Sequence, residues 1–153
     1  MDAKQAYPPN IDSIQAILRP SSTAIFTFGG TIYNPSGREL LPDIIHHEEV
    51  HQKQQGNNSD SWWLRYLGDP QFRLAQEIEA YGKQYAFACK HINAEADRAI
   101  SEGKTLAISP TKLKKWALGS MAAALSGETY GNMCSYGEAE SKIRNIASRI
   151  NQL

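Results

Sequence analysis

Residues 69–92 read DPQFRLAQEIEAYGKQYAFACKHI, and this stretch predicts the main element of the fold. Asp69 followed by Pro70 is typical of a helix start, because the carboxylate caps free amide groups and proline fits the first helical turn. The apolar positions recur at intervals of four and three residues, which is the spacing of one helix face; they are Leu74, Ile78, Tyr81, Tyr85, Ala88 and Ile92. The sequence therefore predicts a long helix over residues 70–93 with one packed side.

Shorter helices are predicted on both sides of this long one. Upstream, Pro42 suits the first turn of a helix that ends at Gly56, and Ser59 with Asp60 can cap a short helix that follows. Downstream, we expect separate helices over residues 94–103, 110–125 and 136–151, the second of them starting after Ser109. From residue 40 onward the chain is therefore predicted to be helical.

The only strand signals lie in residues 23–33, which read TAIFTFGGTIY. Two runs of β-branched and aromatic residues flank Gly29 and Gly30, a pattern that favours a hairpin or a strand with a glycine bulge. Residues 1–22 are punctuated by proline and serine and predict an arm with one short helix over residues 11–18. We therefore expect a mostly helical α+β fold in a single domain over residues 1–153, with the arm at 1–22, the β segment at 23–35 and helices over 40–153.

The composition excludes several classes of protein. The 153 residues include 16 Lys and Arg against 16 Asp and Glu, so no net charge is available to hold a nucleic-acid backbone. No apolar stretch approaches the roughly 20 residues that a membrane span requires. The first ten residues lack the apolar core of a signal peptide, so a cytoplasmic location is expected. Cys89 and Cys134 are isolated and predict no disulfide framework.

The motif His47-Glu48-Glu49-Val50-His51 matches the pattern H-E-x-x-H. Residues four apart lie one above the other on a helix, so the imidazoles of His47 and His51 can converge on one metal ion. Glu48, about 100° further round the helix, reaches the flank of that ion. His46 points about 100° away from the same face and is not expected to join it. The motif therefore predicts a zinc site.

A catalytic zinc ion needs a third protein ligand, and the long helix offers two glutamates. Measured in 100° steps, Glu77 lies about 60° from the centre of the apolar stripe and Glu79 about 140° from it. If that stripe packs on the motif helix, Glu77 is the ligand. Glu79 stays open as the alternative, because Phe72 and Phe87 lie on its side and the helix can be packed on two faces.

These residues resemble the gluzincin group of zinc metallopeptidases, in which two motif histidines and a later helical glutamate hold the metal. Residues 77–81 are similar to the E-x-x-A-D stretch of some membrane gluzincins, although Tyr81 stands where that pattern has Asp. The run from His47 to Tyr81 also resembles small, mostly uncharacterised metallopeptidase-like proteins of phage and bacterial genomes. The resemblance implies a minimal zincin-like domain that binds Zn²⁺ through His47, His51 and Glu77.

The expected activity is hydrolysis of peptide bonds in a peptide or protein substrate, by water that zinc activates. Glu48 is the expected general base, since a carboxylate beside the metal can accept the proton and return it to the leaving amine. Tyr81 and Tyr85, and with them Arg73 and His91, are candidates for orienting a ligand or donating to the transition state.

The segment 23–33 has two interpretations. As an edge strand beside the motif helix, it can pair with an extended substrate through main-chain hydrogen bonds. Alternatively, it is a hairpin that only covers the core.

A second class of function stays open, a non-catalytic module that zinc stabilises. A component of a phage particle is one example, and the protein would then be associated with the virion. The presence of Glu48 favours the enzyme, because metal binding alone does not require that carboxylate.

Overall fold

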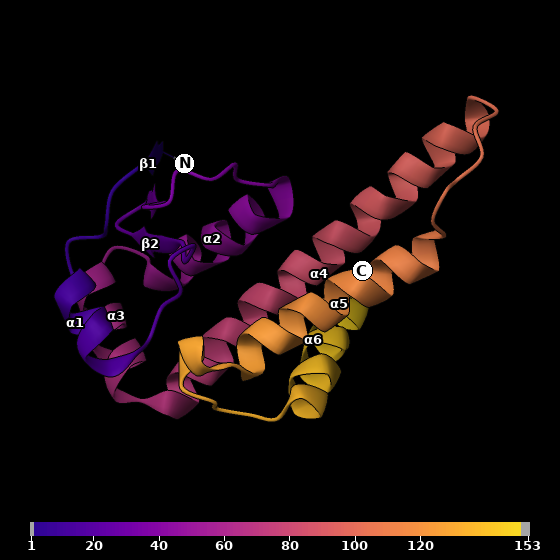
Figure 1. Ribbon diagram of the computed structural model, residues 1–153. Coiled ribbons are helices and arrows are strands. Elements are labelled where there is room, and N and C mark those ends of the chain that lie inside the picture. The colour runs from indigo at the N-terminus through magenta and orange to yellow at the C-terminus, as the bar shows by residue number, and fades with distance from the viewer. Residues whose placement is uncertain (1, 151–153) are drawn as a thin grey trace.

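The computed structural model describes residues 2–150 and confirms the mostly helical α+β fold (Figure 1). A small sheet and two short helices form the N-terminal part, and longer helices form the rest. In chain order the elements are β1 (Asp2–Lys4), α1 (Ile11–Ile17), β2 (Phe26–Phe28), β3 (Thr31–Tyr33), α2 (Pro42–Gln55), α3 (Ser59–Gly68), α4 (Pro70–Ser101), α5 (Pro110–Ser126), the 3₁₀ turn η1 (Glu128–Tyr130) and α6 (Tyr136–Ile150).

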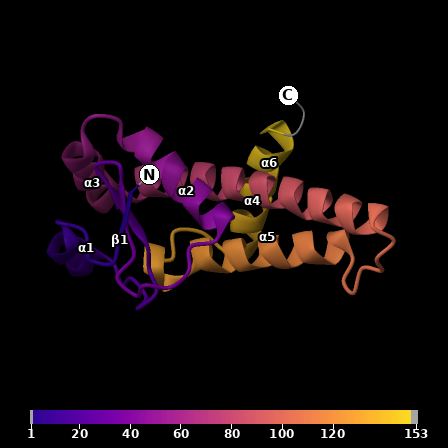
Figure 2. The ribbon, with the colours of Figure 1, turned by 90° about the horizontal axis from the view of Figure 1, so that it is seen from above.

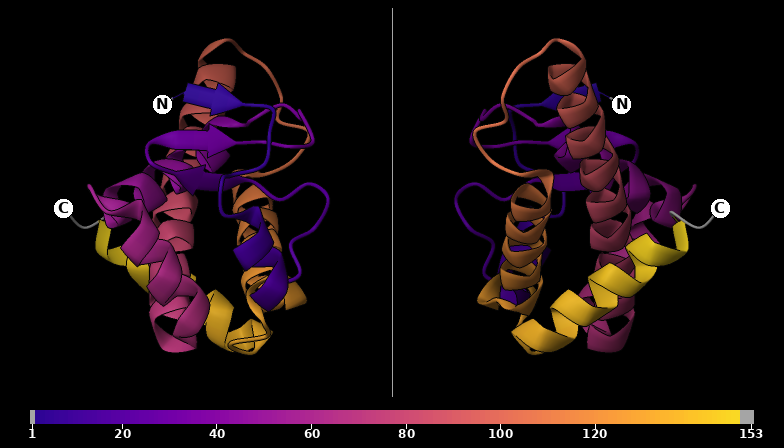
Figure 3. Two further views of the ribbon diagram at one scale, coloured as in Figure 1. Left: turned by 90° about the vertical axis from the view of Figure 1, so that its left-hand side faces the viewer. Right: turned by 90° about the vertical axis from the view of Figure 1, so that its right-hand side faces the viewer.

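The sheet has the strand order β1-β3-β2 (Figure 3). The predicted hairpin is confirmed: β2 pairs antiparallel with β3 across Gly29 and Gly30, whose φ angles are 58° and 82°. Positive φ at both positions is the geometry of a tight hairpin turn, and glycine adopts it without strain. The sequence did not predict β1, which pairs parallel with β3, because its three exposed residues carry no alternating pattern.

Helix α4 begins as predicted but runs further than predicted. One oxygen of Asp69 accepts hydrogen bonds from the backbone amides of Gln71 and Phe72, each at 3.0 Å. The expected separate helix over residues 94–103 is wrong, since α4 continues to Ser101 without a break. Residues 93–101 contain no glycine or proline, and the chain turns only at Gly103, whose φ is 70°.

The ends of the other helices follow local signals. Helix α2 runs from Pro42 to Gln55 with Gly56 after it, as expected. The cap of α3 is Asn58, which accepts a hydrogen bond from the amide of Ser61 at 3.1 Å, so the predicted cap at residues 59 and 60 was placed too late by one or two positions. Helix α6 reaches Ile150, and its expected last residue, 151, lies outside the described residues.

Two hydrophobic clusters hold these elements together. In the first, α4, α5 and α6 pack around Tyr81, Leu118, Met121, Ala122, Leu125, Ala139 and Ile143. In the second, α1, β2 and α3 pack around Ile14, Leu18, Phe26, Trp62, Trp63 and Tyr66. Helix α4 lies side by side with α5, and α2 and α6 also pack on it (Figure 2). The face of α4 that meets α2 is therefore held between the two clusters.

Neither cysteine forms a disulfide, and both are partly buried. Cys134 packs against the first hydrophobic cluster. Among residues 2–150, no helix has the length and apolar character needed to cross a membrane.

Candidate metal centre

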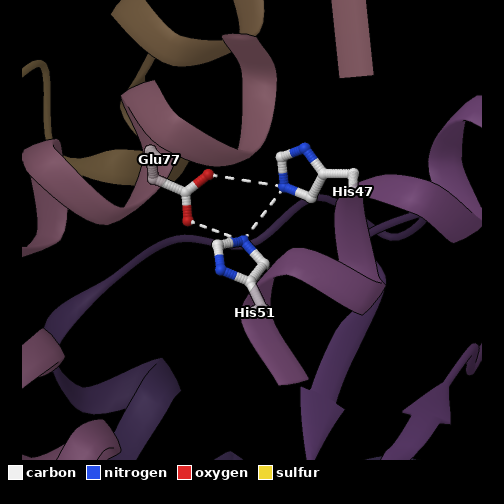
Figure 4. A group of neighbouring side chains, drawn as sticks. All are labelled: His47, His51 and Glu77. Atoms are coloured by element: carbon white, nitrogen blue, oxygen red, sulfur yellow. Dashed lines mark hydrogen bonds and ion pairs between the residues drawn. The ribbon is translucent and has the colours of Figure 1, made fainter. Parts of the chain in front are cut away.

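Helix α2 presents two histidines to α4 from successive turns. The Nε2 atoms of His47 and His51 lie 3.0 Å apart, and both side chains are buried. Glu77 approaches from α4, with Oε1 3.2 Å from the Nε2 of His51 and Oε2 3.6 Å from the Nε2 of His47 (Figure 4). All the donor atoms of this group lie within 4.8 Å of one another. Ligands about 2 Å from a tetrahedral zinc ion have separations of this size.

Burial makes this cluster costly without a cation. Glu77 is only 1% exposed, and its Oε1 accepts a hydrogen bond of 2.6 Å from the hydroxyl of Tyr66. Its Oε2 is buried and has no hydrogen-bond partner among the described residues. A buried carboxylate oxygen without a partner is unfavourable, and a metal ion between the three side chains would remove that penalty. The donor set therefore fits a divalent cation.

Electrostatic interactions at the cluster favour the charged forms of both His51 and Glu77. Burial lowers the pKa of His51, but the charge and hydrogen bond of Glu77 outweigh it and raise that pKa to about 9. Burial raises the pKa of Glu77, yet His51 and His47 together hold it well below its usual range. These shifts favour a buried ion pair between a protonated His51 and an ionised Glu77.

Glu48 lies beside the cluster and is only 5% exposed. The hydroxyl of Thr27 on β2 donates a hydrogen bond of 2.8 Å to its Oε2. Glu48, the two histidines and Glu77 all line one cavity of about 490 Å³. Apolar side chains from distant segments form other parts of its wall; they include Leu18, Phe26, Ile44 and Met121. Space for a small molecule or a short peptide segment is therefore present next to the cluster.

The second candidate ligand, Glu79, lies outside the cluster. Its Oε1 accepts from Lys83 and its Oε2 accepts from Gln54 at 3.1 Å. The structure thus brings Glu77 to the histidines, as the helix geometry favoured, and leaves Glu79 at the edge of the α2–α4 contact. His46 stacks on Phe87 with ring centroids 4.9 Å apart, turned away from the cluster as expected.

Tyr81 is the one candidate donor that contacts the site. Its ring meets that of His47 edge-on with centroids 4.5 Å apart, and it lines the cavity. The hydroxyls of Tyr81 and Tyr130 are 3.0 Å apart. Burial and the charge of Glu77 raise the pKa of both phenols, so both stay protonated and can donate hydrogen bonds.

The other three candidate donors do not reach the cluster. Tyr85 lies on a different surface and lines a separate hollow with Cys89 and Arg144, so its expected place at the site is wrong. The guanidinium of Arg73 donates to backbone carbonyls, including those of Tyr66 at 2.8 Å and Tyr130 at 3.1 Å. It therefore links the end of α3 to η1. His91 is exposed near the far part of α4.

The outer edge of β2 is already covered by side chains. The carbonyl of Thr27 accepts hydrogen bonds from Gln55 at 2.7 Å and from the indole of Trp63 at 3.1 Å. The amide of Gly29 donates to Gln55 at 3.2 Å and to Ser59 at 3.1 Å. Because the carbonyl of Thr27 and the amide of Gly29 are used internally, neither is available to pair with a substrate strand, and the second of the two interpretations is favoured. The hairpin instead covers the core and holds Glu48.

The site also contains residues that the sequence did not single out for it: Tyr66, Tyr130, Gln54 and Gln84. The Nδ1 of His47 lies 3.0 Å from the Oε1 of Gln84, and the Nδ1 of His51 lies 2.8 Å from the Oε1 of Gln54. Helical spacing could have indicated Gln84, because it follows Glu77 by seven residues and so shares its face of α4.

No known protein family, curated protein or solved structure matches this chain. The resemblance to gluzincins accordingly stays a prediction, and the functional argument rests on the chemistry of the site.

Proposed function

We propose that the protein is a zinc-dependent hydrolase, a metallopeptidase that cleaves peptide bonds. The observation that carries this proposal is the position of Glu48, which lines the same cavity as the three-residue cluster without belonging to it. A site that only binds metal has no need for a further buried carboxylate at its edge, whereas hydrolysis requires a general base there.

The ligand set supports zinc and an open coordination position. Two imidazoles and one carboxylate form a ligand set of catalytic zinc, whereas magnesium and calcium prefer oxygen ligands alone. Structural zinc sites usually have four protein ligands. The cluster found within residues 2–150 has three, His47, His51 and Glu77, and it faces a cavity.

Each residue has a defined task in this mechanism. Bound zinc supplies Lewis acidity, which polarises the substrate carbonyl and lowers the pKa of water. The hydroxyl of Thr27 holds Oε2 of Glu48, so we assign Oε1 to accepting the proton of the attacking water and passing it to the leaving amine. The paired phenols of Tyr81 and Tyr130 line the same cavity, and we assign to them the hydrogen bond to the developing oxyanion.

The decisive experiment compares zinc content and hydrolysis in three proteins: wild type, Glu48→Gln and His47→Ala. We expect about one zinc ion per chain in wild type and in Glu48→Gln, because the amide leaves all three ligands in place. His47→Ala should lose the metal. Hydrolysis, measured on denatured casein and on a mixed peptide library by mass spectrometry, should be present only in wild type.

The matched control is Glu49→Gln, which removes the same charge from the adjacent position of α2 and should keep both zinc and activity. Full hydrolysis by Glu48→Gln would refute the assigned base. Glu77→Ala and Glu79→Ala form a second pair, of which only the first should fail to bind zinc at saturating metal. Loss of zinc in Glu79→Ala alone would transfer the ligand role to Glu79.

A further inference from the structure

We infer that Gln84 and Gln54 are positioning residues that fix which nitrogen of each histidine faces the metal, and that Asp43 and Glu79 fix the two glutamines. This inference rests on the proposed metal site. In Figure 4, the second ring nitrogen of each histidine points away from the other two side chains. This nitrogen, Nδ1, forms a hydrogen bond with a glutamine amide oxygen, that of Gln84 at His47 and that of Gln54 at His51.

Each glutamine is held in turn by a carboxylate. The Nε2 of Gln84 donates to the Oδ2 of Asp43 at 2.8 Å, and the Nε2 of Gln54 donates to the Oε2 of Glu79 at 3.1 Å. Gln54 also donates to the backbone carbonyl of Gln76 at 3.1 Å. The structure thus contains two hydrogen-bond chains of the same kind, each running from a histidine imidazole through a glutamine amide to a carboxylate.

The direction of each chain follows from which groups donate and which accept. An ionised carboxylate only accepts hydrogen bonds, so it must face the NH₂ group of the amide. The amide oxygen then faces the imidazole, and because that oxygen also only accepts, Nδ1 must carry the hydrogen. The Nε2 of His47 and of His51 is thereby the nitrogen left to face Glu77 and the metal position, and it is the nitrogen that would bind the metal after losing any proton it carries.

The reverse orientation of either amide is unfavourable. Turning the amide of Gln84 by 180° would place its oxygen against the carboxylate of Asp43, so two acceptors would meet without a hydrogen between them. Gln84 is buried, which strengthens this penalty because water cannot replace the lost bond. The carboxylate therefore selects the tautomer of a histidine that it does not touch.

The chains also connect the two helices of the site. Asp43, His47 and His51 follow one another at intervals of four on α2, while Gln84 shares a face of α4 with Glu77. One chain crosses from α2 to α4 and back, and the other runs along α2 before crossing to Glu79 on α4. The same bonds that orient the imidazoles thus hold α2 in register with α4.

The first test is Asp43→Asn, with Glu49→Gln as the control that removes an equal charge from the same helix. An asparagine can present either a donor or an acceptor to Gln84, so the orientation of the amide is no longer enforced. Zinc affinity, measured by competition with a chromophoric chelator, should fall about tenfold in Asp43→Asn and less than about threefold in the control.

The second test reverses the order of amide and carboxylate. Gln84→Glu alone places two carboxylates in contact and should weaken zinc binding by about tenfold or more. Combining Gln84→Glu with Asp43→Asn restores an alternation of donors and acceptors, and affinity should return to within about threefold of wild type. In the zinc-loaded wild type and double variant, NMR should show a slowly exchanging Nδ1–H of His47 that is absent in Asp43→Asn.

The outcomes separate this inference from the metal site itself. If wild-type protein binds no zinc, the proposed site is refuted. If wild type binds zinc but Asp43→Asn weakens it no more than Glu49→Gln does, the positioning role is refuted and the site stands. Additive losses in the double variant would equally refute it, because a merely structural contribution gives no rescue.

Discussion

The pairing of His51 with Glu77 shows, residue by residue, how the proposed metal ligands act on each other. Both groups are buried, and each is kept charged by the other. The pKa of His51, about 9, lies above neutral pH, so the imidazole of the metal-free protein is protonated at pH 7. A zinc ion that binds Nε2 must displace that proton.

We therefore expect zinc binding at pH 7 to release about one proton per metal ion, and affinity to rise about tenfold per pH unit up to about pH 9. The sign follows from the raised pKa: protons compete with the metal below pH 9 and cease to do so above it. Calorimetric titrations in two buffers of different ionisation enthalpy measure the released proton directly. Equal binding heats in both buffers at pH 7 would contradict the prediction.

Thr27 has a comparable role for Glu48. Thr27→Val removes the hydroxyl with little change of volume and leaves the Oε2 of Glu48 without its 2.8 Å hydrogen bond. We expect a loss of about 1–3 kcal/mol in the free energy of unfolding, because a buried acceptor loses its partner. Hydrolysis should also fall while zinc content stays unchanged, since no ligand is altered. Thr27→Ser retains the hydroxyl and should preserve both; wild-type hydrolysis by Thr27→Val would disprove a positioning role.

At the scale of elements, α4 organises the molecule, because it carries Glu77 on one part of its surface and packs against α6 on another. Gly82 marks the close approach of these two helices. A Cβ atom at this position would overlap the Cβ and the Cγ2 of Ile146 on α6. Contacts so short near the root of a branched side chain require the helices to move apart.

Gly82→Ala is therefore expected to destabilise the protein by about 1–3 kcal/mol, even though alanine is the better helix former. The matched control is Gly137→Ala on α6, where a Cβ meets no atom within 4 Å and stability should be kept or slightly increased. Urea denaturation of the two variants and wild type measures both effects. A Gly82→Ala protein as stable as wild type would show that the α4–α6 contact is not tight.

In the molecule as a whole, the main hydrophobic core borders the candidate metal site at Tyr81 and Met121, but most of its buried residues do not line the cavity of the site. Leu118, Leu125, Ala139 and Ile143 are buried between α4, α5 and α6 without the help of the cluster. A protein whose fold depends on zinc, as in the alternative of a zinc-stabilised module, unfolds when the metal is removed. The arrangement of this core instead favours a fold that persists without metal.

We expect the metal-free protein to keep its helical circular dichroism, and zinc at a hundred times its dissociation constant to add about 2.7 kcal/mol of stability. The same addition should leave the melting temperature of His47→Ala unchanged, because that variant lacks a ligand. Thermal melts with and without chelator provide the measurement. Unfolding on chelation would favour the zinc-stabilised module over the enzyme.

Local features of this chain were predictable from its sequence because each depends on neighbouring residues alone. Asp69 followed by Pro70 favours a helix start through local capping, and Gly29 with Gly30 permits a tight turn without strain. The pairing of His47 with His51 follows from the pitch of a helix. The prediction failed where the signal was weak, as in β1, and where a helix end was assumed without a residue that breaks helices, as after residue 93.

Most of the helices, the hairpin and the position of two histidines on one face of α2, with Glu48 beside them, follow from local sequence alone. Which partners meet that face follows only from the packing of the helices, because it depends on how α4 is rotated against α2. That packing brings Glu77 rather than Glu79 to the histidines, places Gln84 behind His47 and turns Tyr85 away. Contacts between residues distant in sequence arise from burial of several helix faces at once, and no local pattern encodes that outcome.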